Sequence, residues 1–255
     1  MADAQVVFTP PESLHDTLMH YCSGCTHGTL HRVVAEIIDE LGLRESTVGI
    51  CPVGCAVYAY NYFAVDMIEA AHGRAPAVAT GVKRSRPDCT VFTYQGDGDL
   101  ASIGMGEIVH AAARNEAITV VFVNNGVFGM TQGQMAPTTL VGQRASTAPF
   151  GRRPDHEGFP VRVVEMLNAL EGPTYLARAS MASPKWIRDA KRKLRNAFLA
   201  QTEHRGFGLV EVLSSCPTWW GKTPKEALEW MESTTMAYYP VEEFRPLPSS
   251  EPEGE

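Results

Sequence analysis

The sequence predicts an α/β fold built on a mostly parallel sheet. Two apolar segments rich in β-branched and aromatic residues, 90–95 and 118–125, flank "IGMGEIVHAAARN", which has the length and composition of a helix. A strand, a helix and a second strand within about 35 residues form a βαβ unit, which joins parallel strands of one sheet with a right-handed crossover. The 255 residues, 44% of them hydrophobic, suffice for a full core.

The remaining elements alternate in the same way. Residues 28–41 repeat apolar residues at helical spacing and stop at Gly42, a usual residue after a helix. Residues 46–50 form an expected buried strand, and 77–80 form a short apolar run. Residues 126–160, rich in glycine and proline, are an expected long loop, which in a compact domain usually serves function. Later strands and helices are expected at 174–180, 184–201, 208–215 and 223–233.

Composition excludes several classes of protein. A net charge of -7 argues against a nucleic-acid or anionic-membrane surface, and the basic run at 191–195 fits a solvated helix face. No uncharged apolar stretch approaches the length of a membrane span, and the N-terminus does not read as a signal peptide, so a cytoplasmic protein is expected. We expect one domain over 1–240 and an acidic, proline-rich tail over 241–255.

Two polar clusters, "GDGD" and "VNNG", directly follow the two strands of the βαβ unit. Adjacent parallel strands end at one edge of a sheet, so Asp97 and Asn125 are expected to lie together there. Their oxygens, with the carbonyl of Val127, suit Mg²⁺, while Gly96 and Gly98 permit close approach of a phosphate. Each cluster alone is more often a simple turn. Their conjunction predicts a magnesium-bound diphosphate.

The cysteines give a second, independent indication. Cysteine occurs at Cys22, Cys25, Cys51, Cys55, Cys89 and Cys216. Several lie in separate loops that could converge, and soft thiolate ligands fit either zinc or an iron-sulfur cluster, which the residues alone do not distinguish. His27 and His31 keep zinc possible, although two histidines at a helix start are more often packing or surface residues. Cys89 is interpreted as a buried apolar thiol.

Together these motifs resemble one known family. The segments "HYCSGCTHG", "PVGCAVYAYNYFAVDMIEAAHGRAPAVATGVKR", "TYQGDGDLASIG", "FVNNGVFGMTQGQMAPTT" and "EVLSSCPTWW" resemble the thiamine-diphosphate-binding β-type subunit of 2-oxoacid:ferredoxin oxidoreductases over residues 12–240. Among its members the chain is most similar to those that act on branched-chain 2-oxoacids such as 2-ketoisovalerate. The resemblance implies a three-layer thiamine-diphosphate-binding fold with helices on both faces of the sheet.

The resemblance also implies the roles of individual residues. The ligands of one 4Fe-4S cluster would be Cys22, Cys25, Cys55 and Cys216, leaving Cys51 without a ligand role. The Mg²⁺ shell would be Asp97, Asn125 and the Val127 carbonyl. Thiamine diphosphate would be contacted by Val53, Gly54, Cys55, Ala56, Gly96, Gly98, Asp99, Gly129 and Met130. His72 and Arg74 match a motif near the active site of the family, although a His-Gly-Arg turn could equally cap a helix.

The activity implied is oxidative decarboxylation of a 2-oxoacid to acyl-coenzyme A and CO₂, with electrons passing through the cluster to ferredoxin in a hetero-oligomeric enzyme of anaerobic metabolism. The expected partners are an α-type subunit with the pyrimidine-binding domain, a γ-type subunit and a ferredoxin-like δ-type subunit. The glutamate that activates the cofactor is expected on the α-type subunit, because Glu107 reads as a first-turn helix acid and Glu69 as a helix-surface or interface residue. The isolated chain should therefore bind cofactor weakly and not turn over.

Two other functions remain open at this point. One is a thiamine-dependent decarboxylase or synthase without a cluster, and the other is a zinc-stabilised structural subunit. Pyruvate, 2-oxoglutarate and phenylglyoxylate remain alternative substrates.

Overall fold

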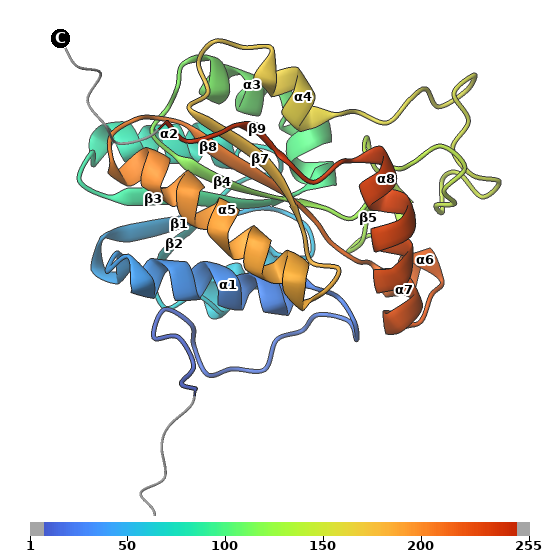
Figure 1. Cartoon of the computed structure of the whole chain (residues 1–255), viewed down its shortest axis with the longest axis horizontal. Coiled ribbons are helices and arrows are strands. Elements are labelled where there is room, and N and C mark those ends of the chain that lie inside the picture. The colour runs from blue at the N-terminus through green and yellow to red at the C-terminus, as the bar shows by residue number, and fades with distance from the viewer. Residues whose placement is uncertain (1–7, 249–255) are drawn as a thin grey trace, which may run out of the picture.

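The structure is a computed structural model that describes residues 8–248. Within that range a seven-stranded sheet forms the middle of the molecule (Figure 1). Its spatial order is β2 (Asp66–Glu69), β1 (Thr47–Cys51), β3 (Thr90–Gly96), β4 (Thr119–Asn124), β8 (Gly208–Leu213), β7 (Tyr175–Ser180) and β9 (Glu243–Arg245). The strands from β2 to β7 are parallel neighbours, and only the pairing of β9 with β7 is antiparallel. The prediction of an α/β fold with a mostly parallel sheet is confirmed.

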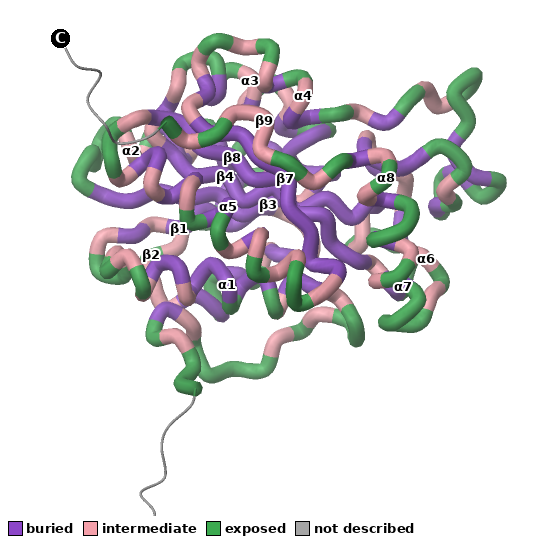
Figure 2. The backbone as a smooth tube through the Cα atoms, viewed as in Figure 1, coloured by how far each residue is buried: buried purple, intermediate pink, exposed green. Residues whose placement is uncertain are grey.

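Helices cover both faces of the sheet, which makes three layers (Figure 1). On one face, α1 (His27–Glu40) and α5 (Pro184–Thr202) pack in an apolar cluster with Phe92 of β3. On the other face, α2 (Ala75–Ser85), α3 (Met105–Ala113) and α4 (Val163–Asn168) share a second cluster with Phe122 of β4. The central strands are buried between these layers (Figure 2). Strand β4 reads as a nearly continuous apolar run for that reason, whereas β7 and β8 each contain one charged residue.

The remaining elements lie near one end of the sheet. They are the two-stranded hairpin β5 (Val127–Phe128) and β6 (Gln134–Met135), and the helices α6 (Pro217–Trp220), α7 (Pro224–Trp230) and α8 (Met236–Tyr238). Four further helical segments are the 3₁₀ segments Arg44–Ser46 and Val57–Asn61 and the π-helical segments Asp99–Ile103 and Met231–Thr235. Within residues 8–248, no helix combines the length and apolar character that a bilayer crossing requires.

Three local features differ from the expectations. The apolar run 77–80 is part of α2, which starts with Pro76 in its first turn, a position where proline favours a helix. Strand β2 escapes sequence analysis because it is a short edge strand whose side chains are largely exposed. Residues 243–245, within the segment predicted as a tail, form the edge strand β9, and the tail residues 249–255 lie outside the described range.

The topology brings several loops to one edge of the sheet. Parallel strands β1, β3, β4 and β8 all end there, so the segments 52–56, 97–99, 125–129 and 214–216 that follow them are neighbours. The start of α1 meets the same edge, since Thr26 Oγ1 and Ser214 Oγ are 2.6 Å apart. Strand β2 is parallel to β1 and ends at this edge as well, so "AHGRA", which lies between β2 and α2, joins the other site motifs there.

Candidate functional site

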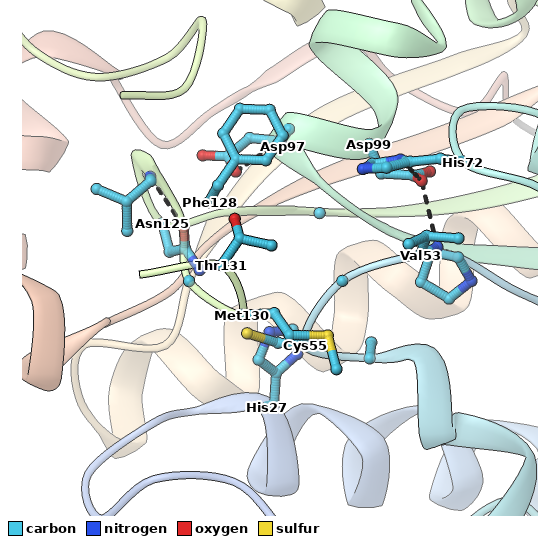
Figure 3. A pocket seen from close by; sticks show the side chains of 17 residues that line it. His27, Val53, Cys55, His72, Asp97, Asp99, Asn125, Phe128, Met130 and Thr131 are labelled. Atoms are coloured by element: carbon cyan, nitrogen blue, oxygen red, sulfur yellow. Dashed lines mark hydrogen bonds and ion pairs between the residues drawn. The ribbon is translucent and has the colours of Figure 1, made fainter. Parts of the chain in front are cut away.

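A cavity of about 110 Å³ opens at this edge of the sheet (Figure 3). Its lining comes from the loops after β1, β2, β3 and β4, from the β5–β6 hairpin, and from the first residue of α1. The lining residues are His27, Pro52, Val53, Gly54, Cys55, Ala56, His72, Gly96, Asp97, Gly98, Asp99, Asn125, Val127, Phe128, Gly129, Met130 and Thr131. All the residues predicted to contact the cofactor therefore line one cavity, together with His72 but without Arg74.

Asp97 is the buried acid of this cavity, with 2% of its surface exposed. Its Oδ1 accepts the Gly98 N–H at 2.9 Å, and its Oδ2 accepts the Gly126 N–H at 2.7 Å and the Thr138 hydroxyl at 2.6 Å. Burial raises the pKa of the carboxyl to about 6, although these hydrogen bonds act in the opposite direction. Among residues 8–248, none of the ion pairs includes Asp97. A buried carboxylate without a cationic side chain beside it suits a bound cation.

Asn125 follows β4 and lies next to Asp97. Its backbone N–H is one of the groups that oppose the rise in the pKa of Asp97. The Asn125 Oδ1 accepts the Val127 N–H at 3.1 Å, which folds residues 125–127 into a tight turn. An amide oxygen has a second lone pair, so this atom can still bind a cation. Two tryptophan side chains hold this segment in place. Trp220 Nε1 donates to the Asn125 carbonyl at 3.0 Å, and Trp219 Nε1 donates to the Gly129 carbonyl at 2.6 Å.

Two glycines lie where side chains would not fit. A Cβ on Gly98 would overlap the ring of Phe128, and a Cβ on Gly129 would lie 3.0 Å from the Cys55 Sγ and 3.7 Å from the Cys216 Sγ. The backbone therefore approaches the cavity closely at both positions, as a phosphate-binding edge requires. Gly129 lines the cavity and also lies close to these two sulfur atoms, so the two predicted parts of the site are neighbours.

Asp99 has a different role from Asp97, because its oxygens join several separate segments of the chain. Its Oδ1 lies 2.6 Å from His72 Nδ1 and accepts the Gly73 N–H at 2.9 Å and the Val53 N–H at 3.3 Å. Its Oδ2 accepts Gln95 Nε2 at 2.6 Å. Asp99 thus fixes the loop after β1 and the turn before α2 against the end of β3.

The two residues of the "AHGRA" motif separate in the structure. His72 faces the cavity, where it contacts Asp99. Arg74 is the residue before α2 and forms an ion pair with Glu107 in the first turn of α3. Glu107 is thus the first-turn helix acid that the sequence predicts, whereas Glu69 is an exposed residue at the end of strand β2 and not part of a helix.

The four cysteines assigned by resemblance come from three loops, and a hydrogen bond joins two of these loops. Ser215 donates to the Gly24 carbonyl at 2.8 Å, which holds the segment before Cys216 against the loop that carries Cys22 and Cys25. Within that loop the Cys25 N–H donates to the Cys22 carbonyl at 3.0 Å.

The thiols of these cysteines influence one another. Burial raises the pKa of Cys55 to about 12, and the charges of Cys216, Cys25 and Cys22 act in the same direction. The pKa of Cys216 is also raised to about 12, by burial and then by Cys25 and Cys22. The geometry agrees for two of them, because the Cys55 and Cys216 sulfurs lie 3.0 Å and 3.7 Å from the position of a Cβ on Gly129. Within residues 8–248, no three His, Cys, Asp or Glu side chains converge closely enough to hold a metal ion.

Cys51 and Cys89 have other surroundings. Cys51 lies at the end of β1 and is buried, and its pKa is raised to about 12 by burial and by Glu69. Cys89 is buried in the apolar cluster shared with α2 and α3, where it acts as a small apolar side chain.

Two residues have places in the site that the sequence analysis did not assign: it considered His27 only for zinc or for packing, and it gave Thr138 no role. His27 is buried and lines the cavity, where its Nδ1 lies 2.8 Å from the Tyr94 hydroxyl; burial lowers its pKa to about 4, so the ring is neutral. Its position directly after "CSGCT" was the available signal. Thr138 contacts Asp97 from 41 residues away, and only its place in "APTT", inside the expected functional loop, hinted at that role.

The chain resembles known proteins in sequence. Residues 49–212 match the family described as thiamine pyrophosphate enzyme, C-terminal TPP binding domain. The ketoisovalerate oxidoreductase subunit VorA of Methanothermobacter thermautotrophicus is 47% identical over 249 residues, which are 94% of this chain and 52% of VorA. The 2-oxoglutarate synthase subunit KorB of Methanocaldococcus jannaschii is 37% identical over 210 residues, which cover 81% of this chain and 73% of KorB. The chain thus spans about half the length of VorA and most of KorB.

A solved structure shares the fold. The 2-oxoglutarate:ferredoxin oxidoreductase from Magnetococcus marinus, with 2-oxoglutarate, coenzyme A and succinyl-CoA bound, superposes with a TM-score of 0.72 and 30% sequence identity. The match covers 84% of this chain and 69% of that chain.

Proposed function

This chain belongs to the thiamine-pyrophosphate-binding subunits of 2-oxoacid oxidoreductases, and we propose that it holds thiamine diphosphate, Mg²⁺ and one 4Fe-4S cluster in such an enzyme. The observation that carries the proposal is the single cavity in which the buried carboxylate of Asp97 and the thiol of Cys55 both take part. The enzyme would convert a 2-oxoacid to an acyl-coenzyme A and CO₂, with ferredoxin as electron acceptor.

The cation would be held by Asp97, Asn125 and the carbonyl of Val127. Hard oxygen ligands suit Mg²⁺, and two diphosphate oxygens with water would complete the shell. A divalent cation would also offset the burial of the Asp97 carboxylate, because it supplies the positive charge that no side chain of residues 8–248 provides. Gly98 and Gly129 would admit the diphosphate, while Met130 and residues 53–56 would surround the rest of the cofactor.

The cluster would be held by Cys22, Cys25, Cys55 and Cys216. A cube of four irons and four sulfides is wider than one ion, so its thiolates need not converge on a point. The mutual effect of these thiols on their pKa values supports a shared anionic site, since the cluster irons would stabilise the thiolates that burial disfavours. Cys55 would connect the two groups, because it lines the cofactor cavity as well.

When bound, thiamine diphosphate supplies the electron sink for decarboxylation of the 2-oxoacid. This chain's own residues bind and orient the cofactor, exclude water and place the thiols beside it. The glutamate that activates the cofactor would come from an α-type subunit with the pyrimidine-binding domain, and γ-type and ferredoxin-like δ-type subunits would complete the enzyme. The similarity to VorA, whose name refers to ketoisovalerate, favours a branched-chain 2-oxoacid, and the apolar Phe128 and Met130 in the cavity suit such a side chain.

A matched pair of cysteine variants tests the proposal. Under anaerobic conditions, Cys55→Ser should lower the iron and acid-labile sulfide content of the purified protein, whereas Cys51→Ser should retain both. Mg²⁺-dependent binding of thiamine diphosphate by isothermal titration should be lost in Asp97→Asn. Zinc without iron in the wild type, or cofactor binding unchanged in Asp97→Asn, would overturn the assignment of the corresponding group.

The substrate is tested on the whole enzyme. Steady-state rates with 2-ketoisovalerate, pyruvate, 2-oxoglutarate and phenylglyoxylate, each with coenzyme A and an artificial acceptor, should give the highest kcat/KM for 2-ketoisovalerate. The single chain should show no turnover in the same assay. A higher value for 2-oxoglutarate would reject the branched-chain assignment and leave the family assignment intact.

A further inference from the structure

A buried ionic group lies beneath the Asn124–Gly126 turn, and the motifs considered so far do not include it. Arg178 of β7 and Glu211 of β8 are both fully buried and directly opposite each other in the sheet. Arg178 Nε donates to Glu211 Oε2 at 2.8 Å, and its Nη2 donates to Glu165 Oε2 at 2.6 Å. Charges in such surroundings are retained only where every polar atom has a partner.

The second oxygen of Glu211 orients the side chain of Asn124, the last residue of β4. Asn124 Nδ2 donates to Glu211 Oε1 at 2.7 Å. An ionised carboxylate can only accept hydrogen bonds, so the amide nitrogen must face it and the amide oxygen must point away. That oxygen accepts the Gly126 N–H at 3.2 Å, and the same N–H donates to Asp97 Oδ2 at 2.7 Å.

A second route leads from the guanidinium to the same carboxylate. The guanidinium of Arg178 lies 5.1 Å from the centre of the Tyr239 ring. The Tyr239 hydroxyl donates to the Thr138 carbonyl at 2.9 Å, and the Thr138 hydroxyl donates to Asp97 Oδ2 at 2.6 Å. Both routes from Arg178 therefore end at one oxygen of Asp97.

We propose that Glu211, held by Arg178, is a positioning residue that fixes the Asn124 amide and thereby the turn at 125–127 that faces Asp97. This inference rests on the proposed function, because it assigns to that turn the cation and diphosphate ligands. The two asparagines of "VNNG" then have different tasks. Asn124 points into the protein and sets the backbone, while Asn125 faces the cavity.

The variant Glu211→Gln tests the hydrogen-bond direction with little change of shape. Glu211 accepts at both oxygens, whereas glutamine has one acceptor and one donor group. If its oxygen remains on Arg178, its amide nitrogen faces the Asn124 amide nitrogen, and two donors oppose each other. Asn124 must then rotate, which turns its own nitrogen toward the Gly126 N–H and removes an acceptor from the turn.

A compensating variant separates positioning from packing. When Glu211→Gln is combined with Asn124→Asp, the introduced amide nitrogen can donate to one oxygen of the introduced carboxylate, and the other oxygen can accept the Gly126 N–H. In the wild type residue 124 donates to residue 211, whereas in the double variant residue 211 donates to residue 124, and the total charge is unchanged. Asn124→Asp alone places two carboxylates against each other and should be the most impaired of the three variants.

The experiment measures the Kd of Mg²⁺–thiamine diphosphate by isothermal titration, with the full chain in the complex in which it is isolated. Glu211→Gln should weaken binding about 10- to 100-fold, the range typical of residues that orient metal ligands. The double variant should bind at least about tenfold more tightly than Asn124→Asp alone, and more tightly than Glu211→Gln. The control is Gln201→Ala, since Gln201 is buried and bonds Val91 and Thr119 at the opposite ends of β3 and β4.

Thermal unfolding of the cofactor-free proteins accompanies each titration. The inference is supported if Glu211→Gln and Gln201→Ala destabilise the protein equally but only Glu211→Gln weakens the binding of Mg²⁺–thiamine diphosphate. Unchanged Kd in Glu211→Gln, or failure of the double variant to improve on both single variants, overturns it. Should Glu211→Gln not fold, Asn124→Ser removes the amide directly and should weaken binding to the same extent; wild-type affinity in that variant would likewise refute the positioning role. Absence of Mg²⁺-dependent binding in the wild type would instead reject the proposed function.

Discussion

Replacing Asp97 with asparagine should make the cofactor-free chain more stable while abolishing cation-dependent cofactor binding. The side chain is buried and carries a charge that no protein cation compensates within residues 8–248. Asparagine has nearly the same shape without the charge. The variant therefore separates the effect of the buried charge on folding stability from its role in cation-dependent cofactor binding.

The size of the effect follows from the pKa of Asp97, which burial raises from 3.8 to about 6. A shift of about two pKa units corresponds to about 3 kcal/mol, by which the ionised carboxylate disfavours folding above pH 6. Asparagine keeps one acceptor oxygen and faces a backbone N–H with its nitrogen, which costs about 1 kcal/mol. The net gain for the variant is about 2 kcal/mol at about pH 8.

The sign of the pH dependence follows from the same shift. A carboxyl whose pKa is raised in the folded state favours folding at low pH, and this contribution is lost as pH rises through about 6. At about pH 4.5 the folded carboxyl is protonated, and the raised pKa of Asp97 destabilises the wild type by only about 1 kcal/mol. The hydrogen bond that asparagine loses costs the variant about the same amount. The advantage of the variant should therefore nearly vanish at that pH.

Urea denaturation of metal-free wild type and Asp97→Asn at about pH 4.5 and about pH 8 measures both free energies of unfolding. Repeating the measurement at the higher pH with Mg²⁺ and thiamine diphosphate at about 100 times Kd should stabilise the wild type by about 2.7 kcal/mol and leave the variant unchanged. A variant less stable than the wild type at the higher pH, or a difference between them that does not depend on pH, would refute the assignment of a desolvated, ionised Asp97.

Three further predictions concern the surroundings of the cavity. Gly129→Ala places a Cβ 3.0 Å from the Cys55 sulfur, so iron content in the anaerobically purified protein should fall while cofactor-free stability changes little. Thr138→Val removes a 2.6 Å hydrogen bond to Asp97, so the pKa of Asp97 should rise further and Mg²⁺-dependent binding should weaken more at about pH 6.5 than at about pH 8.5 in titration calorimetry. Arg152→Met leaves the backbone carbonyls that this buried guanidinium caps without donors, and urea denaturation should show a loss of about 2–4 kcal/mol.

The part of the site that lies at strand ends could be predicted from sequence. The composition of the apolar segments identifies β3 and β4, and the short crossover between them predicts parallel strands of one sheet. Because the two strands are also neighbours, Asp97 and Asn125 meet at one edge. Cys55 follows β1, which pairs with β3, and it is placed by the same rule. These residues need no knowledge of side-chain packing to be brought together.

The supporting residues could not be predicted in this way. Glu211 and Arg178 are charged residues within buried strands, where the apolar pattern gives no reason for them until their register and the Asn124 amide are known. Thr138 reaches Asp97 from a loop without regular structure, and its path follows from contacts rather than from periodicity. Their roles depend on which atoms face each other, and a linear pattern does not contain that information.

The order of the strands also explains how one chain could couple two cofactors. Cys55 follows β1 and lines the cavity, and the Cys55 and Cys216 sulfurs both lie close to Gly129, where a Cβ would be 3.0 Å and 3.7 Å from them. Under the proposed function, Cys55 would therefore border the cofactor and ligate the cluster as well. The same closeness means that a change at Gly129 should disturb both groups at once, whereas a change at Glu211 should disturb only the cation and diphosphate end. Comparing the iron content and the cofactor affinity of these two variants would show whether the site is built from two separable halves.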